Sequence, residues 1–135
     1  KDDPERIGTE HGYYKPSYPI DDLATIKIGE HWDHQGYGDL EEGWYWLRYT
    51  CPVLPDGKRI FLRFGAVDES AWLYVDGKLI AWYDTAFPMK TWTRPFVLEM
   101  TGSVKSQGTH LLAIRVHNAA GGGGIYKPMS LMIEK

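Results

Sequence analysis

Two pairs of adjacent acidic residues have the most obvious capacity for chemistry in this 135-residue sequence. Asp68-Glu69 and Glu41-Glu42 could supply the two carboxylates that hydrolysis of a glycosidic bond requires. That reaction needs carboxyl groups held ~5–9 Å apart around the scissile bond. Neighbouring residues on a strand point to opposite faces, and in turns such residues are usually solvated. We therefore expect no catalytic residues, and no enzyme activity, in this chain by itself.

Residues 31–34, with the sequence His-Trp-Asp-His, are the strongest candidates for binding a metal ion. Histidines at positions i and i+3 can meet on a helix, but this stretch lacks a helical pattern, and no third ligand follows at a diagnostic spacing. Glycines 121–124 lack the lysine and helix of a phosphate-binding loop, and no Gly-x-Ser-x-Gly motif occurs. We therefore predict no metal site and no cofactor from these residues.

Short runs of alternating apolar residues predict an all-β fold. In the run 60–64, Ile60, Leu62 and Phe64 alternate with Phe61 and Arg63, which is the period of a strand. The run 111–117 alternates in the same way, so its aliphatic side chains should face the core. The predicted strands are 24–28, 44–51, 59–66, 71–75, 78–82, 95–99, 111–117 and 125–133. About eight short strands separated by turn residues predict an antiparallel β-sandwich.

The length and charge of the chain limit its organisation and its partners. Residues 1–135 are enough for one domain with a buried core. Residues 1–22 contain three prolines, so we expect an irregular segment packed on that domain. The net charge is −3 with no basic block, and no apolar run approaches the ~20 residues that span a bilayer, so we expect neither nucleic acid nor a membrane as partner. The chain begins at Lys1 without a methionine, so we expect a piece cut from a longer protein. We also expect it to be a monomer.

The order of the strands predicts which loops share an end of the sandwich. Antiparallel strands joined in sequence run alternately up and down, so successive loops alternate between the two ends. Loops 36–43, 67–70, 83–94 and 118–124 should lie at one end, here called the loop end, and loops 52–58, 76–77 and 100–110 at the other. The second set contains no aromatic residue, whereas the first set and its flanking strand ends contain seven. Binding residues concentrate on loops that a rigid scaffold holds, so we expect a ligand at the loop end.

The side chains at the loop end suit a sugar. Pyranose rings present apolar C–H faces that pack on tryptophan and tyrosine, and their hydroxyls bind carboxylates, amides and guanidinium groups. A tryptophan in a β-sandwich is more often part of the core, and Trp44, Trp46 and Trp72, inside predicted strands, favour that role. The predicted carbohydrate-binding residues are Trp82, Tyr83, Asp84, Trp92, Tyr37, Glu69 and Asn118.

Five segments of the sequence together resemble one known domain. They are 21–37 (DDLATIKIGEHWDHQGY), 43–52 (GWYWLRYTCP), 57–80 (GKRIFLRFGAVDESAWLYVDGKLI), 94–104 (RPFVLEMTGSV) and 110–131 (HLLAIRVHNAAGGGGIYKPMSL). They are similar to the galactose-binding-like jelly-roll domain, called the sugar-binding domain, of family 2 glycoside hydrolases. The similarity extends over nearly the whole chain.

The resemblance implies a position beside a catalytic domain. In the family 2 enzymes this domain is not catalytic, and its loops can border the active site of the neighbouring barrel. Two of these loops correspond to 36–43 and 118–124, and Asn118 matches a position that can carry a polar residue near the substrate. The resemblance also implies an extracellular or periplasmic parent enzyme that degrades polysaccharides. Related domains often hold a structural calcium, for which Asp2, Asp3 and Glu5 are candidate ligands without diagnostic spacing.

Two interpretations of function remain open at this point. In the first, the chain is a carbohydrate-binding module that holds an oligo- or polysaccharide by stacking and hydrogen bonds at the loop end. In the second, it is a docking domain that supports the catalytic domain of its parent enzyme and binds no sugar alone, with exposed aromatics such as Trp92 at the interface. A free-standing hydrolase is least favoured, because no positioned pair of carboxylates is predicted.

Overall fold

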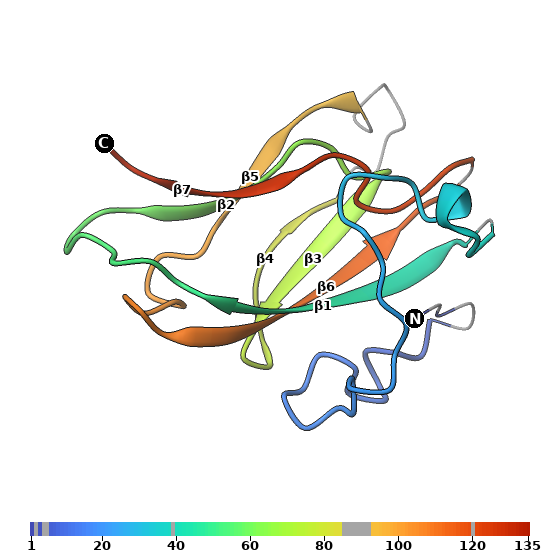
Figure 1. Ribbon diagram of the computed structural model, residues 1–135, viewed down its shortest axis with the longest axis horizontal. Coiled ribbons are helices and arrows are strands. Elements are labelled where there is room, and N and C mark those ends of the chain that lie inside the picture. Colours follow the sequence, from blue (N-terminus) through green and yellow to red (C-terminus); the bar gives the residue numbers. More distant parts are fainter. Residues whose placement is uncertain (2, 4–5, 39, 85–92, 120) are drawn as a thin grey trace.

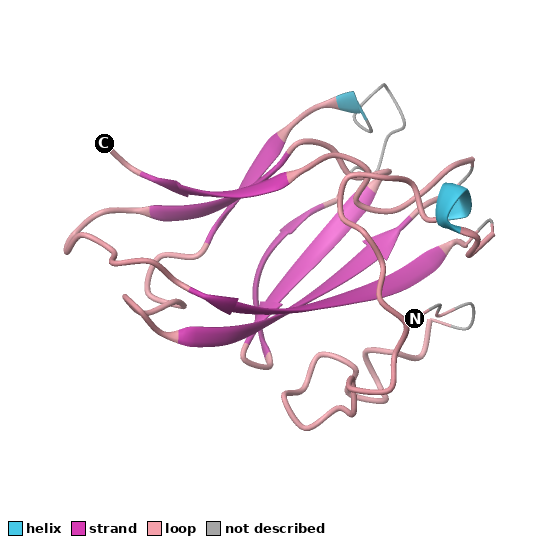
Figure 2. Ribbon diagram, in the orientation of Figure 1, coloured by secondary structure: helices cyan, strands magenta, loops and turns pink. Residues whose placement is uncertain are grey.

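The computed structural model describes residues 1, 3, 6–38, 40–84, 93–119 and 121–135. Within these residues the chain forms seven β-strands and one short 3-10 helix, with no α-helix (Figures 1 and 2). The elements are η1 (Asp33–Gln35), β1 (Glu42–Thr50), β2 (Ile60–Phe64), β3 (Ser70–Val75), β4 (Lys78–Tyr83), β5 (Phe96–Glu99), β6 (Thr109–His117) and β7 (Met129–Ile133). No helix in this described part of the chain is long and apolar enough to cross a membrane.

The strands form two antiparallel sheets that lie one above the other (Figure 1). The four-stranded sheet has the order β1-β6-β3-β4, and the three-stranded sheet has the order β5-β2-β7. Every paired strand runs antiparallel to its neighbour. The predicted antiparallel β-sandwich is therefore confirmed, with seven strands in the described residues where about eight were predicted.

The predicted strand at 24–28 was wrong, and the predicted strand at 125–133 is shorter than expected. The Lys27 backbone N–H donates to Gln35 Oε1 at 2.8 Å, and the Lys27 carbonyl accepts from Gln35 Nε2 at 3.0 Å. A side chain thus satisfies backbone groups that a neighbouring strand would otherwise satisfy. The carbonyl of Ile125 accepts from the Gly29 N–H instead of joining a sheet, and β7 begins only at Met129.

The register of the strands confirms the predicted placement of the loops. Glu42 at the start of β1 lies opposite His117 at the end of β6. Phe64 at the end of β2 lies opposite Met129 at the start of β7. The described parts of the loops before β1, between β2 and β3, after β4 and between β6 and β7 therefore share the loop end. Short connections such as 76–77 lie at the other end.

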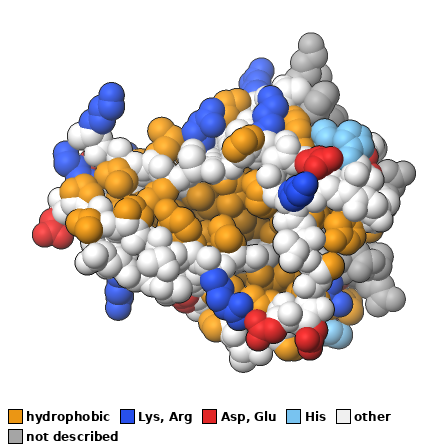
Figure 3. All heavy atoms as spheres, in the orientation of Figure 1, with side chains coloured by type: hydrophobic (Ala, Val, Ile, Leu, Met, Phe, Trp, Pro, Cys, Tyr) orange, Lys and Arg blue, Asp and Glu red, His pale blue; other side chains and the backbone are white. Residues whose placement is uncertain are grey.

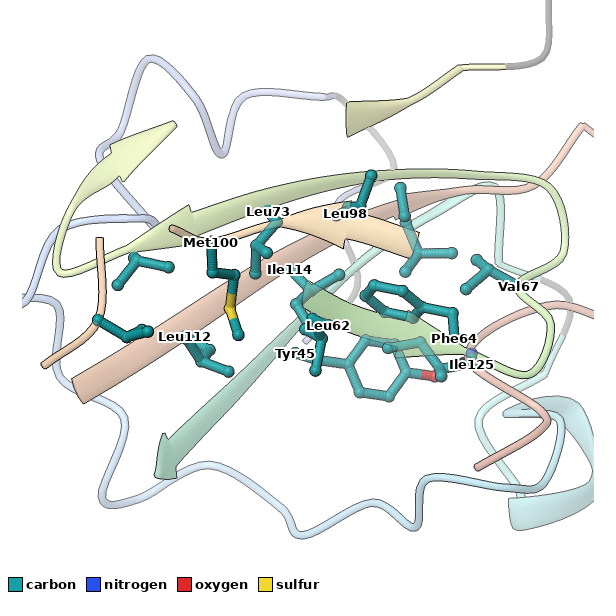
Figure 4. Close-up of a cluster of buried hydrophobic side chains, with 14 of the residues drawn as sticks. Tyr45, Leu62, Phe64, Val67, Leu73, Leu98, Met100, Leu112, Ile114 and Ile125 are labelled. Carbon is teal, nitrogen blue, oxygen red and sulfur yellow. Dashed lines mark hydrogen bonds between the residues drawn. The ribbon is translucent and has the colours of Figure 1, made fainter. Parts of the chain in front are cut away.

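The main core lies between the two sheets. Leu73, Phe64 and Ile114 are fully buried there, which confirms that the alternating aliphatic side chains of the predicted strands face inward. Figure 4 shows these side chains converging between the sheets, with the Tyr45 ring beside Ile125. Each large apolar side chain buried in this way contributes roughly 1.5–3 kcal/mol.

A second aromatic cluster covers the outer face of the four-stranded sheet. Its buried members are Tyr13, Trp44, Tyr74 and Ala113. The carboxylate of Asp3 accepts hydrogen bonds from the N–H groups of Ile7 (2.9 Å) and Gly8 (2.9 Å) and from Trp44 Nε1 (3.0 Å). These bonds hold residues 6–18 against the sheet, so the N-terminal segment covers part of this face.

At one edge of the sandwich, the two sheets leave an opening between their edge strands β1 and β7. A groove of about 420 Å³ there, the side groove, is bounded by residues 20–28 and β1, and Ile114 of the core lines its floor. It continues between β1 and β7 as a smaller hollow of about 80 Å³, lined by Leu47 and by Leu62 and Leu112 of the core. Figure 3 shows the hydrophobic side chains on the floor of this hollow.

Candidate functional site at the loop end

Close contacts between distant segments build the loop end. The backbone N–H of Trp32 donates to the carbonyl of Gly123 at 3.0 Å, and the Gly123 N–H donates to Asp33 Oδ1 at 3.3 Å. The Trp32 ring is buried against the glycines: a Cβ atom on Gly123 would lie 2.5 Å from Trp32 Cζ2, and one on Gly124 would lie 2.4 Å from the Tyr45 hydroxyl. The glycine run therefore allows close backbone approach, and it brings η1 beside the β6–β7 loop.

Histidine, aspartate and glutamate side chains line an open depression at this end, which we call the acidic bowl. Its volume is about 410 Å³, and its lining residues are His31, Asp33, His34, Asp68, Glu69, Gly121 and Gly122. The His31 ring stacks on Tyr126 with centroids 4.2 Å apart and 8° between the planes. His34 meets His31 edge to face at 5.3 Å. The bowl thus combines three carboxylates with a stacked pair of rings.

Burial changes the acid–base properties of the bowl. Asp68 is only 8% exposed, and burial, helped by the nearby carboxylates of Glu69 and Asp33, raises its pKa to about 6. Burial, and then the charge of Asp68, also raises the pKa of the Tyr126 hydroxyl. An aspartic acid with a pKa near 6 can donate a hydrogen bond when protonated and accept one when ionised. The bowl can therefore bind groups that both donate and accept, such as sugar hydroxyls.

Two of the predicted residues, Glu69 and Asn118, lie at the acidic bowl. Glu69 lines the bowl, and its Oε2 accepts a hydrogen bond from the Ala119 N–H at 3.2 Å. Asn118 is buried, and its Nδ2 donates to the carbonyls of Leu40 (3.3 Å) and Gly121 (2.8 Å). Its Oδ1 has no hydrogen-bond partner among the described residues. Asn118 thus ties together the two loops that flank the bowl, beneath its surface.

Of the other predicted residues, the four that the structure describes do not line the bowl. The Tyr83 ring stacks on Phe96 at 4.1 Å and 11°, which places it in the packing between the sheets. Tyr37 donates from its hydroxyl to the Thr25 carbonyl at 3.2 Å and lines a separate cavity of about 380 Å³. Trp82 is exposed on β4, and Asp84 just beyond it accepts a hydrogen bond from Ser70. Trp92 lies outside the described residues. The six predicted residues that the structure describes are thus not one cluster.

The residues considered for metal binding have other contacts. Among the described residues, no three His, Cys, Asp or Glu side chains are grouped so as to hold a metal ion. The Asp3 carboxylate accepts the three N–H hydrogen bonds described above. Asp2 and Glu5, the other calcium candidates, lie outside the described residues.

Known proteins with similar sequence or structure include large glycoside hydrolases. No protein-family model matches the chain. It is 26% identical over 106 residues to a β-glucuronidase of Formosa agariphila, a match covering 77% of this chain and 10% of that protein. A β-glucuronidase of an uncultured Clostridium species superimposes with a TM-score of 0.69 at 25% identity, over 87% of this chain and 20% of the other. The resemblance to family 2 glycoside hydrolases is confirmed.

A named member of glycoside hydrolase family 2, from Bacteroides cellulosilyticus, shares the fold. It superimposes with a TM-score of 0.69 at 21% identity, over 88% of this chain and 18% of that one. The chain thus spans about a tenth of the length of the curated relative and about a fifth of the solved structures. It corresponds to one small part of these family 2 hydrolases.

The sequence did not point to His31, Asp33 and Tyr126 as one group. The His-Trp-Asp-His motif was weighed only as a metal site, whereas Asp68 was considered as a catalytic carboxylate and as part of loop 67–70 at the loop end. Their proximity results from backbone hydrogen bonds between residues 29–32 and 123–125, about 90 residues away along the chain. The signal that could have indicated it is the glycine run, because consecutive glycines mark a place where another part of the chain approaches closely.

Proposed function

We propose that the chain is a non-catalytic accessory domain of a larger glycoside hydrolase, and that the acidic bowl binds the glycan. The observation that carries this proposal is the bowl itself, in which three carboxylates and the His31–Tyr126 ring pair meet at the end where the loops converge. Its supporting context is the similarity to a small part of enzymes named β-glucuronidases. The catalytic domain of the parent enzyme is the expected partner, and the expected location is outside the cytoplasm.

The charges in the bowl limit how a sugar can sit there. Asp33, Asp68 and Glu69 accept hydrogen bonds from hydroxyl groups, and a sugar ring edge can pack against His31, which Tyr126 supports by stacking on it. A uronic acid carboxylate would meet repulsion from these three side chains. If the ligand is a glucuronide, its hydroxyls rather than its carboxylate should enter the bowl. Each sugar contact is small, so we expect modest affinity.

An NMR titration of the 135-residue chain tests this assignment. Methyl β-glucuronide and xylo- and cello-oligosaccharides are added in turn, and backbone amide shifts are followed. The expected result is a set of shifts centred on residues 31–34, 68–69 and 121–124. His31→Ala should weaken binding about fivefold, which corresponds to the loss of one ring contact. His11→Ala, which removes an exposed histidine far from the bowl, is the matched control and should bind as the wild type does.

Three results would contradict the proposal. No shift at the bowl with any of these sugars would refute it, as would equal binding by His31→Ala and the wild type. Release of nitrophenol from chromogenic glycosides by the purified chain, lost in Glu69→Gln, would show instead that the domain is catalytic.

A second candidate function, docking to the catalytic domain without sugar binding, is favoured by the side groove. Exposed apolar side chains, among them Leu47 and Ile28, line the groove, and contact with water forfeits part of their burial energy. Leu47 lines the groove and is 39% exposed, whereas Leu79 on β4 is 40% exposed and does not line it. If the groove docks the catalytic domain, Leu47→Lys should weaken association with a separately expressed catalytic domain and Leu79→Lys should not. Equal association by both variants would exclude the groove as the interface.

A further inference from the structure

Aromatic and guanidinium groups form a row across the outer face of the four-stranded sheet. Trp72 on β3 lies opposite Trp82 on β4 and also opposite Arg115 on β6. Residues directly opposite each other in antiparallel strands project to the same face, so the three side chains are neighbours. Trp44, opposite Arg115 on β1, belongs to the aromatic cluster of the outer face, which places the row on the side away from the core. We call Trp82, Trp72 and Arg115 the tryptophan row.

Arg115 is fixed flat against its neighbour. Its guanidinium carbon lies 4.0 Å from the centroid of the Trp72 ring. Its Nη1 lies 3.3 Å from Oε1 of Glu42, whose side chain is only 3% exposed, and His117 Nδ1 lies 3.1 Å from the other carboxylate oxygen of Glu42. The buried carboxylate therefore orients the guanidinium and offsets its charge. The result is a rigid stack in which the guanidinium lies over the Trp72 ring.

The N-terminal segment covers one end of this face and leaves the other end open. Trp44 is buried under residues 6–18, whereas Trp82 is 60% exposed, the most exposed tryptophan among the described residues. Tryptophan in a β-sandwich is usually part of the core, and an indole left in water loses the stabilisation that burial would give. Asp84 and Ser70, joined by a hydrogen bond of 3.2 Å, lie at the ends of the same two strands and add polar groups beside the rings.

We propose that the tryptophan row is a second binding surface, for an extended β-1,4-linked glycan. Neighbouring strands are ~4.8 Å apart, so three strands give a platform ~10 Å long, comparable to two consecutive sugar rings. Such chains are flat ribbons whose C–H face can lie on the exposed Trp82 ring, while the Arg115 guanidinium, stacked on Trp72, and Asp84 face ring hydroxyls. The proposal shares with the proposed function the premise that this domain binds glycans, but it uses a different surface from the bowl.

Affinity electrophoresis of the 135-residue chain tests the row. Gels containing hydroxyethylcellulose or glucuronoxylan are compared with gels without polysaccharide. Wild-type protein should be retarded, and Trp82→Ala should bind about tenfold more weakly, as expected for loss of a central aromatic anchor. Trp82→Tyr should retain part of the retardation. Leu79→Ala, which removes a 40%-exposed side chain from the same strand, is the matched control and should migrate as the wild type does. Unchanged thermal unfolding of Trp82→Ala would show that its fold is intact.

Comparison with His31→Ala separates this proposal from the proposed function. Loss of retardation in Trp82→Ala but not in His31→Ala supports the row, whatever the bowl binds. Equal retardation of Trp82→Ala and wild type overturns the row while leaving the bowl, which is tested by short oligosaccharides in solution. Absence of retardation of the wild type in both gels also overturns the row.

Discussion

Replacing Asp68 with asparagine should stabilise the folded protein near neutral pH. Burial is the main cause that raises the pKa of Asp68 from 3.8 to about 6, and the carboxylates of Glu69 and Asp33 add to it. The folded chain therefore holds this proton at pH values where the unfolded chain has lost it. The contribution of Asp68 to stability is greatest below pH 3.8, falls as the pH rises towards 6, and is constant above that.

The pKa shift sets the size of the effect. A shift from 3.8 to about 6 is roughly 2 units, and one unit corresponds to about 1.4 kcal/mol, so ionising Asp68 costs the folded state at most about 3 kcal/mol. Asparagine is nearly isosteric and uncharged at every pH. Asp68→Asn should therefore raise the free energy of unfolding by about 2–3 kcal/mol at pH 7.5 and leave it unchanged at pH 3.5.

Urea denaturation of both proteins at a series of pH values between 3.5 and 8 measures this difference. Asp22→Asn, at an exposed aspartate, is the matched control and should follow the wild type throughout. Glu69→Gln should keep most of the fall in the free energy of unfolding between pH 3.5 and 8 that Asp68 causes, because burial raises the Asp68 pKa more than the charge of Glu69 does. Equal stability of Asp68→Asn and wild type at pH 7.5 would refute the reasoning. Loss of the effect in Glu69→Gln would show that repulsion, not burial, raises the pKa.

Two further substitutions test the contacts that hold the loop end and the N-terminal segment. Gly124→Ala should lower the free energy of unfolding by about 2 kcal/mol or more, because φ is +98° there and the new Cβ would clash with the Tyr45 hydroxyl. Thermal unfolding should show a smaller loss for the control Gly121→Ala, because the structure places no atom within 4 Å of a Cβ at Gly121. Asp3→Ala leaves three N–H donors without their carboxylate, so the free energy of unfolding should fall by about 2–3 kcal/mol and residues 6–18 should become sensitive to limited proteolysis. Unchanged cleavage would show that the aromatic contacts alone hold the segment.

The fold could be predicted because its information is local. Alternation along 60–64 and 111–117 identified strands whose inner side chains are buried, and the turn residues between them gave the sequence of reversals. Counting reversals was enough to assign the loops to two ends, because each described connection between strands reverses the chain direction. Residues 24–28 alternate like a strand, but the prediction of a strand there was wrong. The Gln35 side chain hydrogen-bonds to the backbone N–H and carbonyl of Lys27, and the sequence pattern cannot reveal that competition.

The candidate surfaces were less predictable because they depend on register and on distant contacts. Tyr83 and Trp82 are adjacent in the sequence, yet Tyr83 packs between the sheets and Trp82 faces solvent. Which of the two faces outward is decided by pairing with β3, where a bulge between Leu73 and Tyr74 shifts the register. The bowl depends on hydrogen bonds such as Gly123 N–H to Asp33, across 90 residues. The glycine run is the local signal for the bowl, and the orientation of Trp82 has no local signal in the chain.

The two proposed surfaces differ in what holds them, and this difference decides how cleanly each can be tested. The bowl is shaped mainly by backbone, because the glycine run packs on Trp32 without side chains of its own, so His31 can be replaced without removing the support. The tryptophan row is shaped by side chains: Arg115 is held by the buried Glu42, and removing Arg115 would take away one of the cationic partners of this carboxylate and destabilise the fold. Trp82, exposed at the free end of the row, is therefore the position at which a loss of binding can be separated from a loss of stability.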